Sequence, residues 1–377
     1  MKLRHSSTRL AQALGADQNT DKGIIPPIHI ATTYLRDPDN QYRSGYSYGR
    51  PHNPTIQQAE SVIAGLEQGS DAMLFGSGMA AATAVFLSCQ AGDHVIAPKV
   101  MYWSLRKWLV ERSGLDVTFV DMDRPGAVSE VIRAEKTRVV WVETPANPLW
   151  VLTDISATAD VAHQAGAILV VDSTVVTPLI TQPLAHGADL VMHSVTKYLN
   201  GHSDVLAGVL VTANQDEYWK QLQQQRSDLG SILSPRDGAQ LLRGMRTLHL
   251  RVKESCQSAM RIAEFCIDHA GIANVLYPGL PSHPQHELAC RQMKNGFGGM
   301  LSIQLTGGEQ AAIDLAASLC IWKIATSLGG VESLVEHRAS VEGIDSPVPL
   351  NLLRLSVGIE DCEDLIDDLR QGLDLLN

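Results

Sequence analysis

Short, continuously apolar runs recur through the middle of the chain, and helix-length segments separate them. The runs do not alternate apolar and polar residues, which is typical of parallel strands covered by helices on both faces. Residues 79–90 and 102–114, between the runs, have helical composition. The pattern predicts an α/β fold with a mostly parallel central sheet. Its six clearest runs are HVIAP (94–98), VTFVD (117–121), RVVWVE (138–143), AILVVD (167–172), DLVMHS (189–194) and GVLVTA (208–213).

The rhythm changes in the last third of the chain. A long helical stretch near 236–270 precedes YPGLPSHP, which is punctuated by Pro and Gly, and GGMLSIQLTGG then has the pattern of a strand. The first fifty residues hold few long apolar runs and many turn formers. We therefore expect an extended arm over 1–50, an α/β domain over 51–235 and a smaller C-terminal α+β domain over 236–377.

The composition is typical of a soluble globular protein, with 45% hydrophobic and 19% charged residues among 377. No uninterrupted apolar stretch reaches the ~18 residues of a membrane span, and the start, MKLRHSSTRLAQ, lacks the apolar segment of a signal peptide. We therefore expect a cytoplasmic protein that does not bind membranes. The six cysteines form no C-x-x-C pair, which favours reduced thiols. A formal net charge of -11 argues against nucleic-acid binding, because that binding depends on clustered basic charge.

Three neighbouring predicted strands end in chemically complementary residues. Because the carboxyl ends of parallel strands meet at one edge, where ligands bind, we expect these side chains to share a site. They are Glu143 and, four residues on, Asn147 after the first strand; Asp172 at the end of the second; and Ser194, Thr196 and Lys197 at the end of the third. A lysine at the inner end of a buried strand is costly unless it is paired or neutralised, which makes Lys197 a candidate working group.

A glycine-containing segment, FGSGMAA (75–81), precedes a predicted helix. Its glycines would let backbone N–H groups approach a phosphate at the helix N-terminus. A phosphate cradle, a buried acid and a lysine are what pyridoxal phosphate requires. The lysine forms a Schiff base, the acid keeps the pyridine nitrogen protonated, and the cradle anchors the cofactor.

Each feature alone has a more ordinary interpretation. Lys197 alone fits a surface lysine, and Asp172 alone fits a helix cap. The G-x-G-x-x-A pattern also opens dinucleotide-binding folds, as in a nucleotide-dependent oxidoreductase. That interpretation needs an acidic residue at the end of the following strand, where this chain has Ala97 and Pro98. The histidines near the lysine lack a fourth clustered metal ligand, so we expect no metal site.

The segment SVTKYLNGHSDVLAG resembles the lysine motif of the Cys/Met-metabolism family of pyridoxal-phosphate enzymes, which includes cystathionine γ-synthase, cystathionine β- and γ-lyases and methionine γ-lyase. The resemblance implies an aspartate-aminotransferase-like fold of type I, pyridoxal 5'-phosphate as cofactor, and a homotetramer of two dimers with shared active sites. The family's motifs occur in order along nearly the whole chain: IPPIHIATTY, YSYGRPHNPT, FGSGMAA, ETPANPLW, D-x-T-x-x-TP, the lysine motif, YPGLPSHPQH with GFGGMLSIQL, SLGGVESL and LRLSVGIED.

The resemblance also implies roles for individual residues. Lys197 would carry the Schiff base and Asp172 would hold the pyridine nitrogen. Tyr102 would stack on the ring and assist proton transfer, and Asn147 would contact the phenolic oxygen. The phosphate ligands would be the backbone N–H groups of Gly78 and Met79, the hydroxyls of Ser194 and Thr196, and Tyr48 and Arg50 of the arm of the neighbouring subunit. On the substrate side, Arg354 would clamp the carboxylate, with Ser327 and Thr326 close by and Lys107 placed for a distal carboxylate.

The chain departs from the family pattern near the substrate. Ser173 replaces an asparagine, Thr326 replaces a glutamate frequent in enzymes acting on cystathionine, and Ser104 replaces a cysteine of methionine γ-lyases. EHRASVEGIDSPVP also lacks the family's HPxSMTH-like pattern. We expect elimination or replacement at the γ-carbon of a γ-substituted amino acid. The alternatives are a C–S β-lyase, a γ-lyase that cleaves a C–O or C–N bond of a homoserine-type substrate and, from another class, the oxidoreductase.

Overall fold

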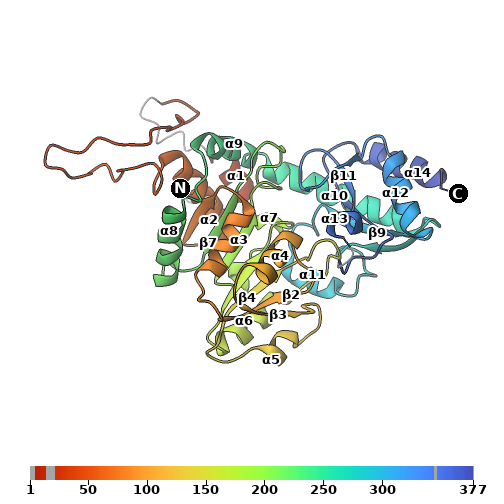
Figure 1. Ribbon diagram of the computed structural model, residues 1–377. Helices are drawn as coiled ribbons and strands as arrows, with labels where there is room; N and C mark the ends of the chain where they lie inside the picture. The colour runs from red at the N-terminus through yellow and green to blue at the C-terminus, as the bar shows by residue number, and fades with distance from the viewer. Residues whose placement is uncertain (1–4, 14–21, 344–345, 377) are drawn as a thin grey trace.

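The protein contains two β-sheets, one formed by the N-terminal half of the described chain and one by the C-terminal half (Figure 1). The computed structural model describes residues 5–13, 22–343 and 346–376. The larger sheet has seven strands in the order β1-β7-β6-β5-β4-β2-β3. Its strands are β1 (Asp71–Phe75), β2 (His94–Pro98), β3 (Asp116–Val120), β4 (Thr137–Glu143), β5 (Ile168–Asp172), β6 (Leu190–Ser194) and β7 (Gly208–Thr212). The expected α/β architecture with a mostly parallel central sheet is confirmed.

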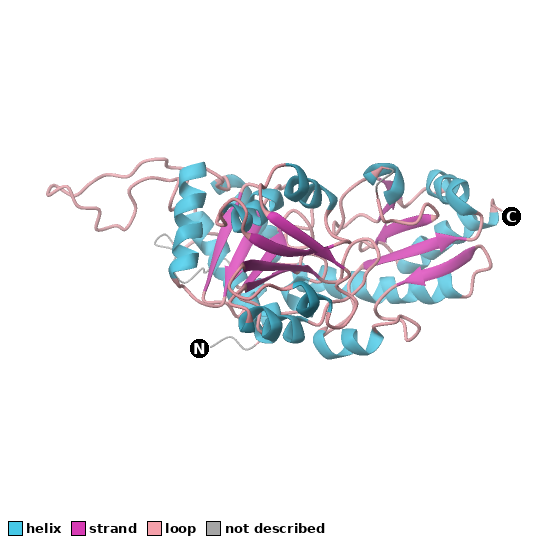
Figure 2. Ribbon diagram, turned by 60° about the horizontal axis from the view of Figure 1, so that its bottom comes forward, coloured by secondary structure: helices cyan, strands magenta, loops and turns pink. Residues whose placement is uncertain are grey.

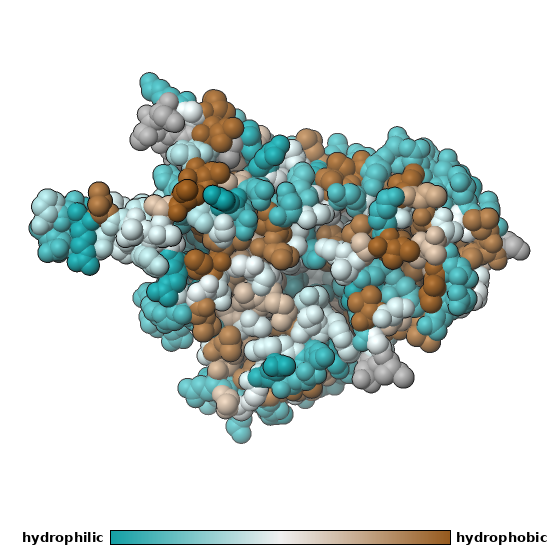
Figure 3. Space-filling model, turned by 45° about the horizontal axis from the view of Figure 1, so that its top comes forward, coloured by the Kyte–Doolittle hydropathy of each residue, from teal (hydrophilic) through white to brown (hydrophobic). Residues whose placement is uncertain are grey.

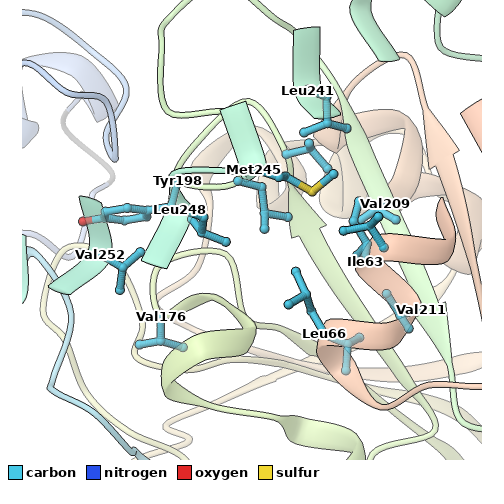
Figure 4. Packing of buried hydrophobic residues seen from close by; sticks show 14 of the residues in the cluster. Ile63, Leu66, Val176, Tyr198, Val209, Val211, Leu241, Met245, Leu248 and Val252 are labelled. Atoms are coloured by element: carbon cyan, nitrogen blue, oxygen red, sulfur yellow. The ribbon is translucent and has the colours of Figure 1, made fainter. Parts of the chain in front are cut away.

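Helices cover both faces of this sheet, which explains why its strands are apolar throughout. Along β4, Val139 and Trp141 belong to one buried cluster, whereas Val140 and Val142 belong to another on the opposite face. Figure 4 shows part of a third cluster, where α2 packs against β7 and α9 packs on α2. The helices of this half are α2 (Pro54–Glu67), α3 (Gly78–Leu87), α4 (Trp103–Glu111), α5 (Ala127–Val131), α6 (Ile155–Gln164), α7 (Thr177–Ile180), α8 (Glu217–Leu229) and α9 (Pro235–Met245).

The six predicted strands are present, but β1 was not predicted and β7 is not parallel to its neighbours. β7 runs antiparallel to both β1 and β6, so β1 is parallel to β6. Phe75 and Ser194, the last residues of β1 and β6, both pair with Gly208 at the start of β7. The glycine segment after β1 therefore emerges at the same edge as the ends of β4, β5 and β6.

The C-terminal half forms a second, smaller sheet with its own hydrophobic core (Figure 2). The helical stretch predicted near 236–270 is two helices, α9 and α10 (Leu248–Ile267), and α9 packs on α2 of the first half. The domain boundary at residue 235 stays a prediction. The remaining elements are β8 (Ile272–Leu276), α11 (His286–Gln292), β9 (Met300–Leu305), α12 (Gly308–Ser318), β10 (Lys323–Ile324), β11 (Leu334–His337), α13 (Arg338–Glu342), β12 (Leu352–Ser356) and α14 (Cys362–Asp374).

The N-terminal segment has a packed part and an exposed part. Helix α1 (Ser6–Ala11) buries Leu10 completely against the body. Residues 23–50 project outward, as Figures 1 and 3 show. This projecting arm exposes large apolar side chains, including Ile24, Ile30 and Leu35, which is 94% exposed. Among the helices of the described ranges, none is long and apolar enough to cross a membrane.

Candidate active site

A cavity of about 200 Å³ lies at the edge where β1, β4, β5 and β6 end. Leu328, from the C-terminal half, closes part of it, so both halves contribute to the walls. Eight of the residues predicted from the sequence line this cavity: Gly78, Met79, Tyr102, Asn147, Asp172, Ser194, Thr196 and Lys197. The predicted convergence of strand ends is therefore present in the structure.

The N-terminus of α3 forms a tight cradle on one side of the cavity. Ser77 caps the helix, and its Oγ accepts a hydrogen bond from Ala80 N at 3.0 Å. A Cβ at Gly78 would lie only 2.8 Å from Ser194 Oγ, so only glycine fits between the helix and β6. The N–H groups of the first helical turn have no partner within the helix and favour an anion. Together with the hydroxyls of Ser194 and Thr196, they fit a phosphate group.

A partly buried carboxylate, that of Asp172 at the end of β5, also lines the cavity. Asp172 Oδ1 accepts hydrogen bonds from Thr174 N at 3.0 Å and from Thr174 Oγ1 at 2.5 Å, which orient the carboxyl group. Burial raises the pKa of Asp172, because the charged form loses its hydration. A cationic ring nitrogen beside Asp172 would favour the charged form, which is the partnership that a pyridinium requires.

Glu143 is a member of the site to which sequence reasoning assigned no role. It follows Val142 at the end of β4 and stands in register with Asp172 on β5. Its two oxygens accept hydrogen bonds from Tyr102 N at 2.7 Å and Asn147 N at 3.2 Å. Burial and the charge of Asp172 raise the pKa of Glu143 to about 8. Glu143 therefore fixes the backbone that carries the two polar side chains expected to face the cofactor ring.

Lys197 extends into the cavity and reaches the C-terminal half. Its Nζ donates a hydrogen bond to Ser327 Oγ at 2.7 Å. Ser327 has a φ of 90°, a left-handed conformation that is costly for a serine and is concentrated at functional sites. Burial, followed by the positive charge of Arg354, lowers the pKa of Lys197 to about 8. The amine is thus far more readily neutral than an ordinary lysine, and a neutral amine is the form that acts as a nucleophile or base.

Arg354 is buried next to the cavity, although it is not among the residues that line it. Its guanidinium donates to Asn147 Oδ1 at 3.1 Å and to Ser327 O at 2.7 Å, and it pairs with Glu336. Sequence reasoning did not single out Glu336, which faces Arg354 across the β11–β12 ladder. Arg354 therefore contacts Asn147, which lines the cavity, and Ser327, which binds the lysine.

Six predicted site residues do not line the cavity of a single chain: besides Arg354 and Ser327, described above, they are Tyr48, Arg50, Lys107 and Thr326. Tyr48 is half-exposed on the arm, and the Arg50 guanidinium lies 5.9 Å from its ring centroid. Lys107 Nζ lies on the surface of α4, 3.9 Å from Glu111 Oε1, and Thr326 is exposed beside Ser327. Their roles stay predictions, and those of Tyr48 and Arg50 require a second copy of the chain.

Comparison with known proteins decides the family. Residues 7–374 match the model of the Cys/Met metabolism PLP-dependent enzyme family. The chain belongs to this family. Cystathionine gamma-synthase from Mycobacterium tuberculosis (strain ATCC 25618 / H37Rv) is 42% identical over 383 residues, covering 98% of this chain and 95% of the relative. Cystathionine gamma-lyase from Dictyostelium discoideum is 40% identical over 370 residues, covering 95% of each.

The solved structures agree. A crystal structure of cystathionine gamma synthase from Xanthomonas oryzae pv. oryzae in complex with cystathionine is 36% identical and superimposes with a TM-score of 0.94, covering 99% of this chain and 98% of that chain. The predicted family, fold and cofactor are therefore confirmed. This Cys/Met-metabolism enzyme depends on pyridoxal 5'-phosphate and is of the trans-sulfuration type, similar to cystathionine γ-synthases and γ-lyases. The cradle at Gly78, the partly buried acid and the lysine fit that cofactor.

Proposed function

We propose that the enzyme catalyses elimination or replacement at the γ-carbon of a γ-substituted amino acid, with Lys197 as the residue that holds pyridoxal phosphate and moves the protons. The observation that carries this proposal is the environment of the Lys197 amine. It lines the cavity, is partly buried and held by Ser327, and is made less basic by desolvation and by Arg354. These features favour a neutral amine that can give up its place to a substrate amine and then act as a base.

When bound, pyridoxal 5'-phosphate supplies an aldehyde that combines with amines and a ring that accepts electrons released at Cα. Arg354 binds the substrate carboxylate through its planar guanidinium, which matches two carboxylate oxygens. Lys197 then removes the Cα proton. For a leaving group on Cγ, a second proton must leave Cβ, and the same amine accepts it after passing on the first. Tyr102 lies at the mouth of the cavity, where its ring can cover the cofactor and its hydroxyl can assist.

The remaining predicted residues hold the cofactor. We assign the phosphate to the Gly78 and Met79 N–H groups with the Ser194 and Thr196 hydroxyls, and the pyridine nitrogen to Asp172. Asn147 is assigned to the phenolic oxygen. The exposed apolar side chains of the arm support docking on a second copy, which would bring Tyr48 and Arg50 to the partner's phosphate. We propose a tetramer of two such dimers.

The choice of γ-chemistry is supported by the relatives, which include a γ-synthase at 42% and a γ-lyase at 40% identity. Lys107 on α4 would suit a substrate with a distal carboxylate, such as cystathionine. Thr326, where enzymes that act on cystathionine often have glutamate, keeps a different leaving group open. A C–S β-lyase and a γ-lyase that releases an oxygen- or nitrogen-linked group are the alternatives.

The test is an absorption spectrum of the purified protein followed by turnover of a substrate panel. The panel comprises cystathionine, O-acylhomoserines with and without cysteine, methionine, and γ-oxy and γ-guanidinooxy amino acids. Release of 2-oxobutanoate indicates γ-elimination, and cystathionine formed from an O-acylhomoserine and cysteine indicates γ-replacement. Pyruvate from cystathionine would replace this proposal by a β-lyase. Absence of a visible cofactor band after addition of pyridoxal phosphate would contradict the role of Lys197.

A further inference from the structure

Four buried charges of alternating sign run from the proposed carboxylate site into the C-terminal half. Arg354 pairs with Glu336; Arg338 donates to the same Glu336 oxygen, Oε2, at 3.0 Å and also pairs with Glu342. All four side chains are at most 7% exposed. Ser346 Oγ donates to the second oxygen of Glu342 at 2.6 Å. The cluster therefore contains two cations and two anions largely shielded from water, with Arg354 at the end nearest the cavity.

The local fold explains how the four groups meet. Glu336 and Arg354 are direct partners on the antiparallel strands β11 and β12. Arg338 begins α13 two residues after Glu336, and Glu342 lies one turn further along the same helix. Arg338 and Glu342 both fall in the segment that departs from the family's HPxSMTH-like pattern. In this chain the Arg338–Glu342 ion pair therefore lies next to Glu336, the partner of Arg354.

The shared oxygen of Glu336 couples the two arginines. A substrate carboxylate must attract Arg354 in competition with Glu336, which already neutralises much of its charge. Arg338 draws on the same Glu336 oxygen and so leaves Arg354 more positive toward the cavity. Glu342 opposes this effect, because it neutralises Arg338. In a buried site such charges act over several ångströms with little screening by water.

We propose that Arg338 and Glu342 are positioning residues with opposite effects: Arg338 increases, and Glu342 decreases, the affinity of Arg354 for a substrate carboxylate. The inference rests on the proposed function only in taking Arg354 as the carboxylate ligand. Loss of Arg338 leaves the cluster with a net negative charge and weakens carboxylate binding. Loss of the Glu342 charge leaves a net positive charge and strengthens it. Loss of both charges returns the net charge of the cluster to zero, as in the parent.

The experiment measures the Kd values of L-alanine and of L-alaninamide for the holoenzyme, using the change in cofactor absorption as the signal of binding. L-Alanine has no leaving group, so it binds without turnover, and L-alaninamide lacks the carboxylate charge. The ratio of the two Kd values therefore measures how much the carboxylate charge contributes to binding. Arg338→Met should reduce the preference for L-alanine about tenfold, the size expected for one unit charge roughly 10 Å away at an effective dielectric constant of about 20. Glu342→Gln should increase the preference by a similar factor, and the double variant should return it close to that of the parent.

Opposite signs separate this mechanism from structural damage, because both single substitutions break the same ion pair. Changes in the same direction, or no change, would overturn the inference. If Arg338→Met does not fold, Glu342→Gln decides alone, since only the electrostatic mechanism predicts tighter binding of L-alanine. Arg226→Met is the matched control: it breaks the largely buried Arg226–Glu60 pair, 2.8 Å long, and should leave the preference unchanged.

The same data test the proposed function separately. A parent enzyme without preference for L-alanine over L-alaninamide would contradict both the role of Arg354 and this inference. A clear preference that the variants leave unaltered would contradict this inference alone and leave the proposed function intact.

Discussion

Replacing the proposed catalytic lysine should make the cofactor-free protein more stable at neutral pH. Burial and Arg354 lower the pKa of Lys197 from its ordinary value of 10.5 to about 8. A fall of about 2.5 in pKa corresponds to about 3 kcal/mol of unfavourable free energy for the folded protein with a charged lysine. Lys197→Met removes this cost but also the hydrogen bond to Ser327, worth about 1 kcal/mol. We expect a net gain of about 2 kcal/mol at pH 7.

The gain must depend on pH in a defined direction. Below pH 8 the amine is charged in both the folded and the unfolded state, so folding bears the full cost of burying the charge. As pH rises from 8 toward 10.5, the folded protein loses the proton first and the cost disappears. The advantage of Lys197→Met should therefore be largest at or below pH 7 and close to zero at pH 10.

Urea unfolding of the cofactor-free parent and variant at pH 7 and pH 10, at one protein concentration, measures this difference. Lys107→Met serves as the control, because Lys107 is an exposed lysine on α4 and its loss should change the free energy of unfolding by less than about 0.5 kcal/mol at either pH. A stability difference for Lys197→Met that is the same at both pH values, or a destabilised variant at pH 7, would refute the reasoning.

Three further predictions concern the cofactor site. Gly78→Ala should weaken pyridoxal phosphate binding at least tenfold and destabilise the protein by about 1–3 kcal/mol, because its Cβ would lie 2.8 Å from Ser194 Oγ. Equilibrium dialysis measures the binding and thermal melts measure the stability. Ser194→Ala is the control for the loss of the hydroxyl alone. Arg50→Ala and Lys197→Ala should each be inactive, yet regain activity after unfolding and refolding as a mixture; no recovery would show that the arm does not complete a neighbour's site. Glu143→Gln should retain the cofactor but lower kcat about tenfold or more, since one of the two backbone N–H groups loses its acceptor; unaltered kinetics would remove Glu143 from the site.

The sequence predicted the part of the site that depends on strand ends. Continuous apolar runs locate β4, β5 and β6, and in a parallel sheet their last residues must share an edge, so Asp172 and Lys197 could be placed together. The position of the glycine cradle could not be derived in this way, because β1 was missed and reaches the edge only through its antiparallel pairing with β7. The family resemblance supplied what the strand pattern could not.

The charge cluster was missed for a different reason. Glu336 meets Arg354 only through the register of β11 against β12, two strands separated by a helix and a connection. No local pattern in the sequence reports that register. The strained backbone of Ser327 is equally hidden, since serine is not a residue that signals a left-handed conformation. The pairing of Glu336 with Arg354 and the backbone conformation of Ser327 are both fixed by tertiary packing and not by the local sequence.

The lysine and the carboxylate site belong to one electrostatic system. Arg354 and Arg338 both lower the pKa of Lys197, whereas Glu336 raises it. In the proposed mechanism, burial and the arginines favour a neutral Lys197 amine before substrate binds. A substrate carboxylate bound at Arg354 would cancel part of that positive charge and so raise the proton affinity of Lys197 at the stage where the amine is proposed to accept a proton from Cα. Holding Arg354 within hydrogen-bond distance of Ser327 O, beside the hydroxyl that binds the lysine, is what makes this coupling direct.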